Sequence, residues 1–305
     1  MSANLTAAFL AALSGLFLSI IGVTFRWGQS KGVVPLHIAT CMGIFGAIFF
    51  GFKADWSLMR ELPRFIYIIA IANGLGQIVA MELTKHSLRR GPLSPVWCAM
   101  NLTFLLVTLY AAFMFGEKIT LTQYLAIGAG FISVMFASTI GGGTQEKIVV
   151  SLQDKIIYGL MLVLILITNS IIFIAIKDLS TRIIPGTELT WLGKYTANIY
   201  FIFYTVLAFS TGAVVVAQKS RPTAWKYLFG LGVLAGIGSI GGMFLLSLCA
   251  RYPAAIVFTV NGMIIILGGA LASVAFFGEK AGRAWYGTIG FGIAAVFLAN
   301  LDKFF

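Results

Sequence analysis

Apolar stretches long enough to cross a lipid bilayer recur along the whole chain. A helix of about twenty residues, rising about 1.5 Å per residue, spans a hydrocarbon core about 30 Å thick. Lipid offers no partner to an unpaired backbone group, so helices are expected, and the stretches lack the alternation of barrel strands. Of 305 residues, 59% are hydrophobic and 10% charged, unlike a soluble domain. We predict an all-α integral membrane protein of the cell (inner or plasma) membrane.

Charged residues and Gly/Pro positions divide the chain into ten candidate transmembrane helices. They cover roughly residues 5–25, 32–52, 65–88, 92–115, 120–140, 155–177, 190–213, 223–249, 253–277 and 284–301. The segment from Gly141 to Lys147 separates the first five spans from the last five. We therefore expect a first five-helix unit over 1–140, a linker over 141–153, and a second five-helix unit over 154–305.

The two units match each other in sequence when the chain is shifted by 162 residues. The matched positions include Gly74 with Gly236, Gly76 with Gly238, Met81 with Met243, Arg89 with Arg251, and Gly116-Glu117-Lys118 with Gly278-Glu279-Lys280. Shared apolar composition would not align glycines and a charged triplet, so a duplication is indicated. Because five is odd, the two copies enter the membrane from opposite sides. The sequence thus predicts two inverted five-helix repeats, an arrangement common in secondary transporters.

Net charge and motifs exclude several other classes. The charge of +11 is spread over loops and helix ends, and the longest basic run is Arg89-Arg90, which favours interfacial anchoring over nucleic-acid binding. The chain contains no HExxH, CxxC, GxSxG or Walker motif, and its histidines, His37 and His86, lie in separate segments. We expect no enzyme, no catalytic residue, no cofactor and no metal. The expected partners are a small-molecule substrate and membrane lipid, and the protein is expected to be a monomer or a homodimer.

Two copies of one pattern give the chain a family resemblance. In the first unit an apolar helix lies between Ser87-Leu88-Arg89-Arg90-Gly91-Pro92 and Phe115-Gly116-Glu117-Lys118. In the second unit a helix lies between Ala250-Arg251-Tyr252-Pro253 and Phe277-Gly278-Glu279-Lys280. This pattern resembles the ten-helix, EamA-type carriers of the drug/metabolite transporter superfamily over most of the chain. The resemblance implies a central cavity lined mainly by helices 1, 3, 4, 6, 8 and 9 of the ten.

Polar side chains within the third span are the first candidates for a substrate site, because such groups are costly in a membrane. Asn73 and Gln77 are four residues apart and share one helix face. Gly74 and Gly76 between them would allow close approach by a neighbouring helix or a ligand. The repeat places Ser239 opposite Gln77. The alternative interpretation is helix packing with the amides bonded across the interface.

Other candidate contacts lie in the spans that the resemblance places around the cavity. They are Trp97 and Asn101 in the fourth span, Asn169 in the sixth and Asn261 in the ninth. Trp97 could stack on a planar or cationic solute, or it could be an interfacial tryptophan. Each asparagine could instead be a packing amide.

Three glutamates need separate interpretations. Glu82 lies within the third span and could couple transport to protons, but Lys85, three residues on, is spaced for an intrahelical pair. Glu117 and Glu279 each follow a glycine that could end a helix in a left-handed cap. Thr120-x-x-Gln123 then offers a capping box for the fifth span.

These features predict a secondary transporter that moves a small polar or zwitterionic organic metabolite by alternating access, in the direction of export. The alternatives are a proton-coupled multidrug or cation efflux carrier, a membrane-embedded enzyme, and a receptor-like binding protein. The charge of the loops favours termini outside, whereas the family resemblance favours termini inside, so orientation stays open.

Overall fold

The computed structural model describes residues 3–88, 96, 99–137, 152–219, 225–278 and 282–301, and these are almost entirely helical. The helices are α1 (Ala3–Ser30), α2 (Pro35–Lys53), α3 (Trp56–Glu61), α4 (Arg64–Leu88), α6 (Thr103–Phe115), α7 (Leu121–Ala137), α8 (Leu152–Thr181), α9 (Trp191–Ala217), α10 (Trp225–Cys249), α11 (Ala254–Phe277) and α12 (Arg283–Asn300). Every predicted span overlaps a helix. The predicted linker, 141–153, falls largely outside the described residues.

Seven of the described helices, namely α1, α2, α4, α8, α9, α10 and α11, are long and apolar enough to cross a membrane. The helical segments Ala99–Phe115 and α7 are apolar but shorter, and α12 has 18 residues. Large aromatic side chains are exposed on the outside, among them Phe52, Phe113 and Phe209. Water would disfavour such a surface, whereas lipid accepts it. The chain is a multi-pass, all-α membrane protein.

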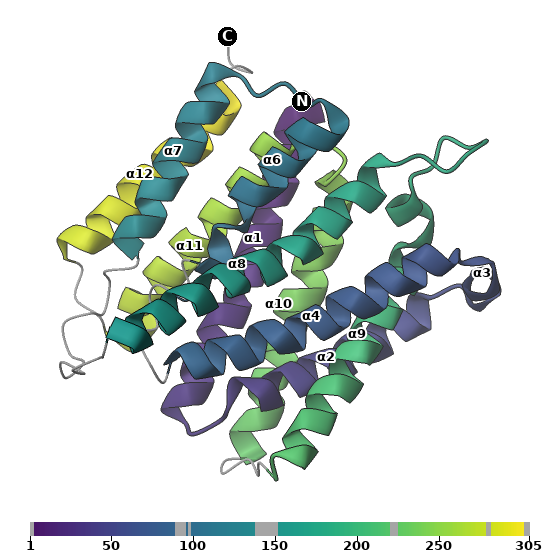
Figure 1. The fold of residues 1–305 in the computed structure, drawn as a ribbon, viewed down its shortest axis with the longest axis horizontal. Coiled ribbons are helices and arrows are strands. Elements are labelled where there is room, and N and C mark those ends of the chain that lie inside the picture. Colours follow the sequence, from purple (N-terminus) through teal and green to yellow (C-terminus); the bar gives the residue numbers. More distant parts are fainter. Residues whose placement is uncertain are drawn as a thin grey trace.

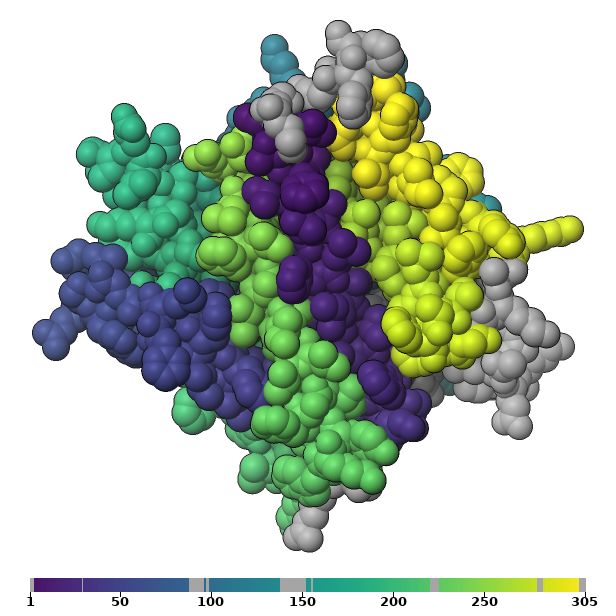
Figure 2. Space-filling view, turned by 180° about the vertical axis from the view of Figure 1, so that it is seen from behind, coloured from purple at the N-terminus to yellow at the C-terminus, as the bar shows by residue number. Residues whose placement is uncertain are grey.

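The helices pack in pairs that join distant parts of the sequence (Figure 1). Helix α1 packs on α10 and α11, and α8 packs on α4 and α6. Helix α2 packs on α9, and α7 packs on α12. Seen from behind, α1 in purple runs beside α10 in green (Figure 2). These long-range pairs hold the first and second halves of the chain together.

Glycine supplies close contacts between the helices at two of the repeat-matched positions. A Cβ atom at Gly74 of α4 would lie 2.8 Å from the side chain of Val206 in α9. A Cβ atom at Gly238 of α10 would lie 2.7 Å from the carbonyl oxygen of Phe17 in α1. Both distances are too short for any side chain, so these glycines set the separation of the helices.

Helix caps that the sequence predicts are present. Gly116 and Gly278 end α6 and α11 in the left-handed conformation, with φ of 64° and 65°. The Thr120 N–H donates to the Gln123 side chain at 3.1 Å, and the Gln123 N–H donates to the Thr120 hydroxyl at 3.3 Å. The capping box before α7 is therefore confirmed. Glu279 lies outside the described residues.

The short helix α3 lies between the predicted spans 32–52 and 65–88, where the sequence predicts no element. The Asp55 carboxylate accepts hydrogen bonds from the N–H groups of Ser57 and Leu58 and so caps the first turn. The Asn198 side chain donates to the carbonyl oxygen of Asp55 at 2.8 Å. A helix of six residues carries too little hydrophobic periodicity to be recognised from sequence.

Candidate functional site

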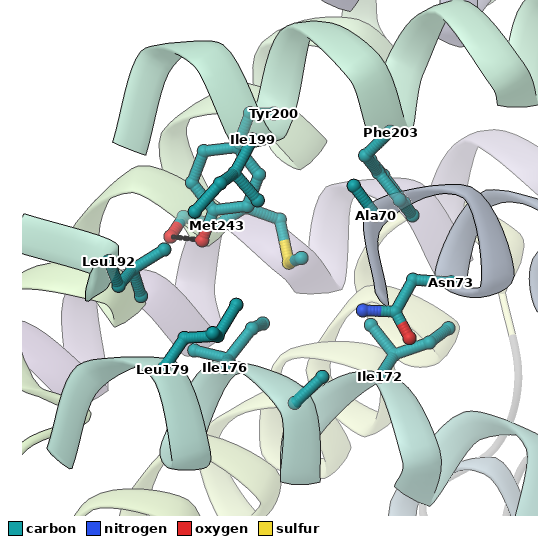
Figure 3. A pocket seen from close by; sticks show the side chains of 11 residues that line it. Ala70, Asn73, Ile172, Ile176, Leu179, Leu192, Ile199, Tyr200, Phe203 and Met243 are labelled. Carbon is teal, nitrogen blue, oxygen red and sulfur yellow. Dashed lines mark hydrogen bonds between the residues drawn. The ribbon is translucent and has the colours of Figure 1, made fainter. Parts of the chain in front are cut away.

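A small cavity lies between α4, α8, α9 and α10 (Figure 3). Its volume of about 20 Å³ has room for about one water molecule. It is lined by Ala70, Asn73, Ile172, Ala175, Ile176, Leu179, Leu192, Ile199, Tyr200, Phe203 and Met243. The walls are thus apolar, with a single amide and a single phenol among them. In this conformation the site is closed around a space smaller than any organic solute.

Asn73 is the predicted binding residue that lies on this cavity. Its side chain is only 9% exposed, and Figure 3 shows its amide directed into the space between Ile172 and Phe203. Among the described residues the amide has no hydrogen-bond partner. The close approach of α4 to α9 at Gly74 places it there. Neither amide atom is among the fully buried, unpartnered side-chain atoms of the described residues, so the Asn73 amide keeps access to the cavity and can bond with water or a ligand there.

Gln77 extends the polar face of α4 by one turn but does not line the cavity. It is half-buried, and the part of the chain that the structure describes offers it no hydrogen-bond partner. Space is available beside it, because a Cβ atom at the adjacent Gly76 would meet nothing nearer than the Thr168 methyl group at 3.7 Å. The two amides therefore form a polar face of which Asn73 is the enclosed end.

The tyrosine on the cavity is already engaged. Tyr200 of α9 donates its hydroxyl hydrogen to the carbonyl oxygen of Met243 at 3.0 Å, as the dashed line in Figure 3 shows. Its ring and that of Phe203 then form the α9 wall. The free hydrogen-bonding capacity among the lining side chains thus belongs to Asn73.

Helix α9 bends beside the cavity. Tyr195 has non-helical backbone angles (φ −115°, ψ 19°), and the Thr196 hydroxyl donates back to the carbonyl oxygen of Leu192. Such back-bonding to the preceding turn bends helices. The bend separates Leu192 from Ile199, and both line the cavity.

Two other predicted residues lie in helix packing and away from the cavity. The Asn261 side chain donates to the Ala11 carbonyl oxygen at 3.2 Å and to the Ser14 hydroxyl at 2.9 Å, tying α11 to α1. The hydroxyls of Ser239 and Tyr204 are bonded at 2.7 Å between α10 and α9. Their hydrogen-bonding groups hold helices together in this conformation.

Two further candidates, Asn169 and Asn101, are also separate from the cavity lining. Asn169 donates to the carbonyl oxygen of Ile165 at 2.9 Å within α8. Asn101 is half-buried, and its carbonyl oxygen lies near Gly262 of α11. Trp97 lies outside the described residues. The structure therefore brings Asn73 to the cavity without Asn169 or Asn101.

Glu82 belongs to a polar cluster at the end of α4. Its carboxylate lies 3.4 Å from the Lys85 Nζ and 3.8 Å from the His86 Nε2, so the predicted pair with Lys85 is confirmed. Gln218, which follows α9, donates to Glu82 at 3.0 Å and accepts from Lys85 at 2.6 Å. The cluster ties the ends of α4 and α9 together.

A buried ion pair escaped the sequence analysis. Lys177 of α8 is 0% exposed, and its Nζ lies 2.5 Å from Glu117 Oε1. Lys177 also donates to the carbonyl oxygen of Tyr252 at 2.8 Å. The Ala254 N–H donates to Glu117 Oε2 at 2.7 Å, so Glu117 also caps α11. The sixth predicted span ends at Lys177, so the sequence indicates an interfacial cation there. In the structure α8 continues to Thr181.

Comparisons with known proteins give limited similarity. No family model matches the chain. The chain is 32% identical over 75 residues to a probable 4-amino-4-deoxy-L-arabinose-phosphoundecaprenol flippase subunit ArnE from Yersinia pestis (strain Pestoides F), and equally to that of Yersinia pseudotuberculosis serotype O:1b (strain IP 31758). The match covers 25% of this chain and 62% of each relative.

A solved crystal structure shares the fold across nearly the whole chain. It aligns with a TM-score of 0.69 at 16% identity and covers 96% of both chains. The fold is thus one that a solved protein also adopts. The matched flippase subunits, by contrast, are covered over less than two thirds of their length.

Proposed function

We propose that this chain is a secondary transporter of the EamA type, with ten transmembrane helices in two inverted five-helix repeats, residues 1–140 and 154–305. Helix packing supports this proposal. In the proposed repeats, α1 corresponds to α8, and α10 corresponds to α4. The pair α1 and α10 therefore corresponds to the pair α8 and α4, and both pairs are in contact. The pairs α1 with α11 and α8 with α6 correspond in the same way. The pairs α2 with α9 and α7 with α12 map onto themselves.

The observation that carries a transport function is the unpartnered Asn73 amide in a closed cavity between the two halves. Helix α4 comes from the first repeat, and α8, α9 and α10 come from the second. A site at such a seam is opened to one side or the other when the repeats rock. Because the closed space holds about one water molecule, a solute can enter only after the helices separate.

The transported solute is a small organic metabolite, moved outward across the cell membrane by alternating access. The similarity to relatives described as flippase subunits supports movement of a molecule across a bilayer. Neutral amides at Asn73 and Gln77 would bind a polar or zwitterionic group. The site is proposed for binding and release without chemical conversion.

Counterflow in proteoliposomes tests this function. Purified protein is reconstituted, loaded with unlabelled metabolites and supplied with the same compounds in labelled form, and a carrier accumulates label transiently. The Asn73→Leu/Gln77→Leu double variant should reduce exchange at least about tenfold while remaining folded. Conversion of the solute would indicate an enzyme, and binding without exchange would indicate a receptor.

Cysteine labelling tests the inverted repeats separately. In a cysteine-free background, Lys118→Cys lies just before α7 and Arg283→Cys begins α12, two helices that occupy matching places in the repeats. An impermeant maleimide should label one of them from outside and the other from inside. Labelling of both from the same side would overturn the inverted arrangement.

A further inference from the structure

The cavity wall divides into a polar end and an apolar end. Asn73 lies at one end beside Ile172, whereas Leu179, Leu192 and Tyr200 lie at the other (Figure 3). The eleven lining residues include no charged side chain. A solute admitted when the helices separate would therefore meet the free amide of Asn73 at one end. At the other end it would meet hydrocarbon and a Tyr200 hydroxyl whose hydrogen is already donated to Met243.

We infer that the transported solute is an uncharged amphiphile that presents one compact hydrogen-bonding group, such as a carboxamide, to Asn73 and an apolar group to the wall formed by Leu179, Leu192 and Tyr200. This inference rests on the proposed transport function and names the substrate class of the same site. It narrows the expected substrate class, a polar or zwitterionic solute, because the structure shows apolar lining residues that the sequence analysis did not identify.

The hydrogen-bonding inventory limits the polar part of the solute. A free asparagine side chain offers two N–H donors and one carbonyl acceptor, which a carboxamide can match from one side. The Tyr200 hydroxyl hydrogen is already donated to Met243. A solute with several hydroxyl groups would leave most of them unpaired in the cavity, at a cost for each.

Charge is disfavoured for the same reason. Transferring an ion from water into an apolar space costs far more than transferring a neutral amide, unless a counter-charge is present. Lys177, which follows the lining residue Ile176 in sequence, does not serve, because Glu117 and the Tyr252 carbonyl oxygen already hold its ammonium group. An apolar group on the solute, by contrast, gains about 25 cal/mol for each Å² removed from water.

Binding of three matched probes tests the substrate class. Benzamide has the carboxamide and an apolar ring, acetamide has the carboxamide alone, and benzoate has the ring with a charge. Full-length protein in detergent micelles is titrated with each probe, and thermal stabilisation yields the dissociation constants. We expect benzamide to bind at least about tenfold more tightly than acetamide or benzoate.

Variants locate the binding to the cavity. Asn73→Leu should abolish the preference for benzamide, whereas Thr168→Val, which removes a hydroxyl outside the cavity lining on α8, should leave it unchanged. Asn73→Asp should shift the preference to benzylammonium, because a carboxylate in place of the amide stabilises a cation. The shift is a gain of binding, so it cannot be explained by misfolding.

Three results would overturn the inference. They are equal or tighter binding of acetamide or benzoate, undiminished benzamide binding by Asn73→Leu, and failure of all probes to bind. None of these touches the transport proposal, which stands or falls on counterflow with the metabolite mixture. If counterflow succeeds and benzamide fails, the function holds and the substrate class is wrong.

Discussion

Lys177 Nζ lies 2.5 Å from Glu117 Oε1 and joins α8, the first helix of the second half of the chain, to the turn between α6 and α7. The lysine is fully buried, and the side chain of Glu117 is 21% exposed. Because the second carboxylate oxygen caps α11 at Ala254, the pair fixes three segments at one point. Removing one partner from such a pair leaves an uncompensated charge in a low-dielectric site.

Lys177→Met should therefore lower the free energy of unfolding by about 3–5 kcal/mol. The Lys177→Met/Glu117→Gln double variant should recover much of this loss, because neither charge is then left alone. Lys118→Met is the matched control, since Lys118 is exposed on the same turn. Denaturant unfolding of the detergent-solubilised protein measures all three. A double variant as unstable as the single one would show that the charge pair is not the cause.

Two buried asparagines should respond in opposite directions to the same substitution. Asn73→Leu removes an amide without a partner and should leave stability unchanged or raise it by about 1 kcal/mol. Asn261→Leu breaks bonds to Ala11 and Ser14 and should lower stability by about 1–2 kcal/mol. Thermal unfolding without added solute compares them. Equal losses at both positions would mean that Asn73 has a structural role.

Adding a methyl group to α4 should have effects that depend on position. Gly74→Ala places a Cβ atom 2.8 Å from Val206, so α4 and α9 must separate, at about 1–3 kcal/mol. Gly76→Ala meets its nearest atom at 3.7 Å and should be neutral or stabilising, because alanine favours helix over glycine. Thermal unfolding of the two variants checks this, and a ranking in the opposite order would contradict the described approach of α4 to α9.

The cap of α3 should weaken in acid. The hydroxyl of Ser57, and then its N–H, donate to the Asp55 carboxylate and hold its pKa below the usual value. A lowered pKa stabilises the folded state above the unfolded-state pKa, and this stability is lost as pH falls through the folded-state pKa. Hydrogen-exchange protection of the Ser57 and Leu58 amides should fall in that range. In Asp55→Asn, which accepts hydrogen bonds but does not titrate, protection should no longer follow pH.

Neutralising Glu82 should change stability little and leave the pH profile of transport unchanged. Its carboxylate is held by Lys85 and Gln218 at the ends of two helices, a partly exposed site where ion pairs contribute less than about 1 kcal/mol. Counterflow by Glu82→Gln across a range of pH measures this. A shifted or flattened profile would instead assign Glu82 to proton coupling.

Hydrophobic length and cap chemistry made the helices predictable, because both are local properties of the sequence. The left-handed Gly116 and the Thr120–Gln123 box are read from a few adjacent residues, and Gly74 was expected to permit close approach. Other features depend on which helices meet. Asn261 and Asn73 look alike in sequence, and their difference arises because Ser14 faces the first and a cavity faces the second.

The residues that sequence analysis missed are of two kinds. The cavity-lining Ile172, Ile176 and Leu179 are spaced along one face of α8, but they are indistinguishable from core or lipid-facing residues in an apolar helix. Lys177 was hidden by the assumption that a cation marks the membrane boundary. The continuation of α8 beyond the lysine, from Asp178 to Thr181, would have been the signal.

The break in α9 at Tyr195 divides the part of the cavity wall that α9 forms into two segments. Leu192 precedes the break and moves with the first turn of the helix, whereas Ile199, Tyr200 and Phe203 follow it and stay with the segment packed on α2. Swinging the first turn outward would widen the end lined by Leu192, while the end beside Asn73 and Phe203 keeps its shape. Entry of a solute would then require movement of only the first turn of α9 and not of the entire helix.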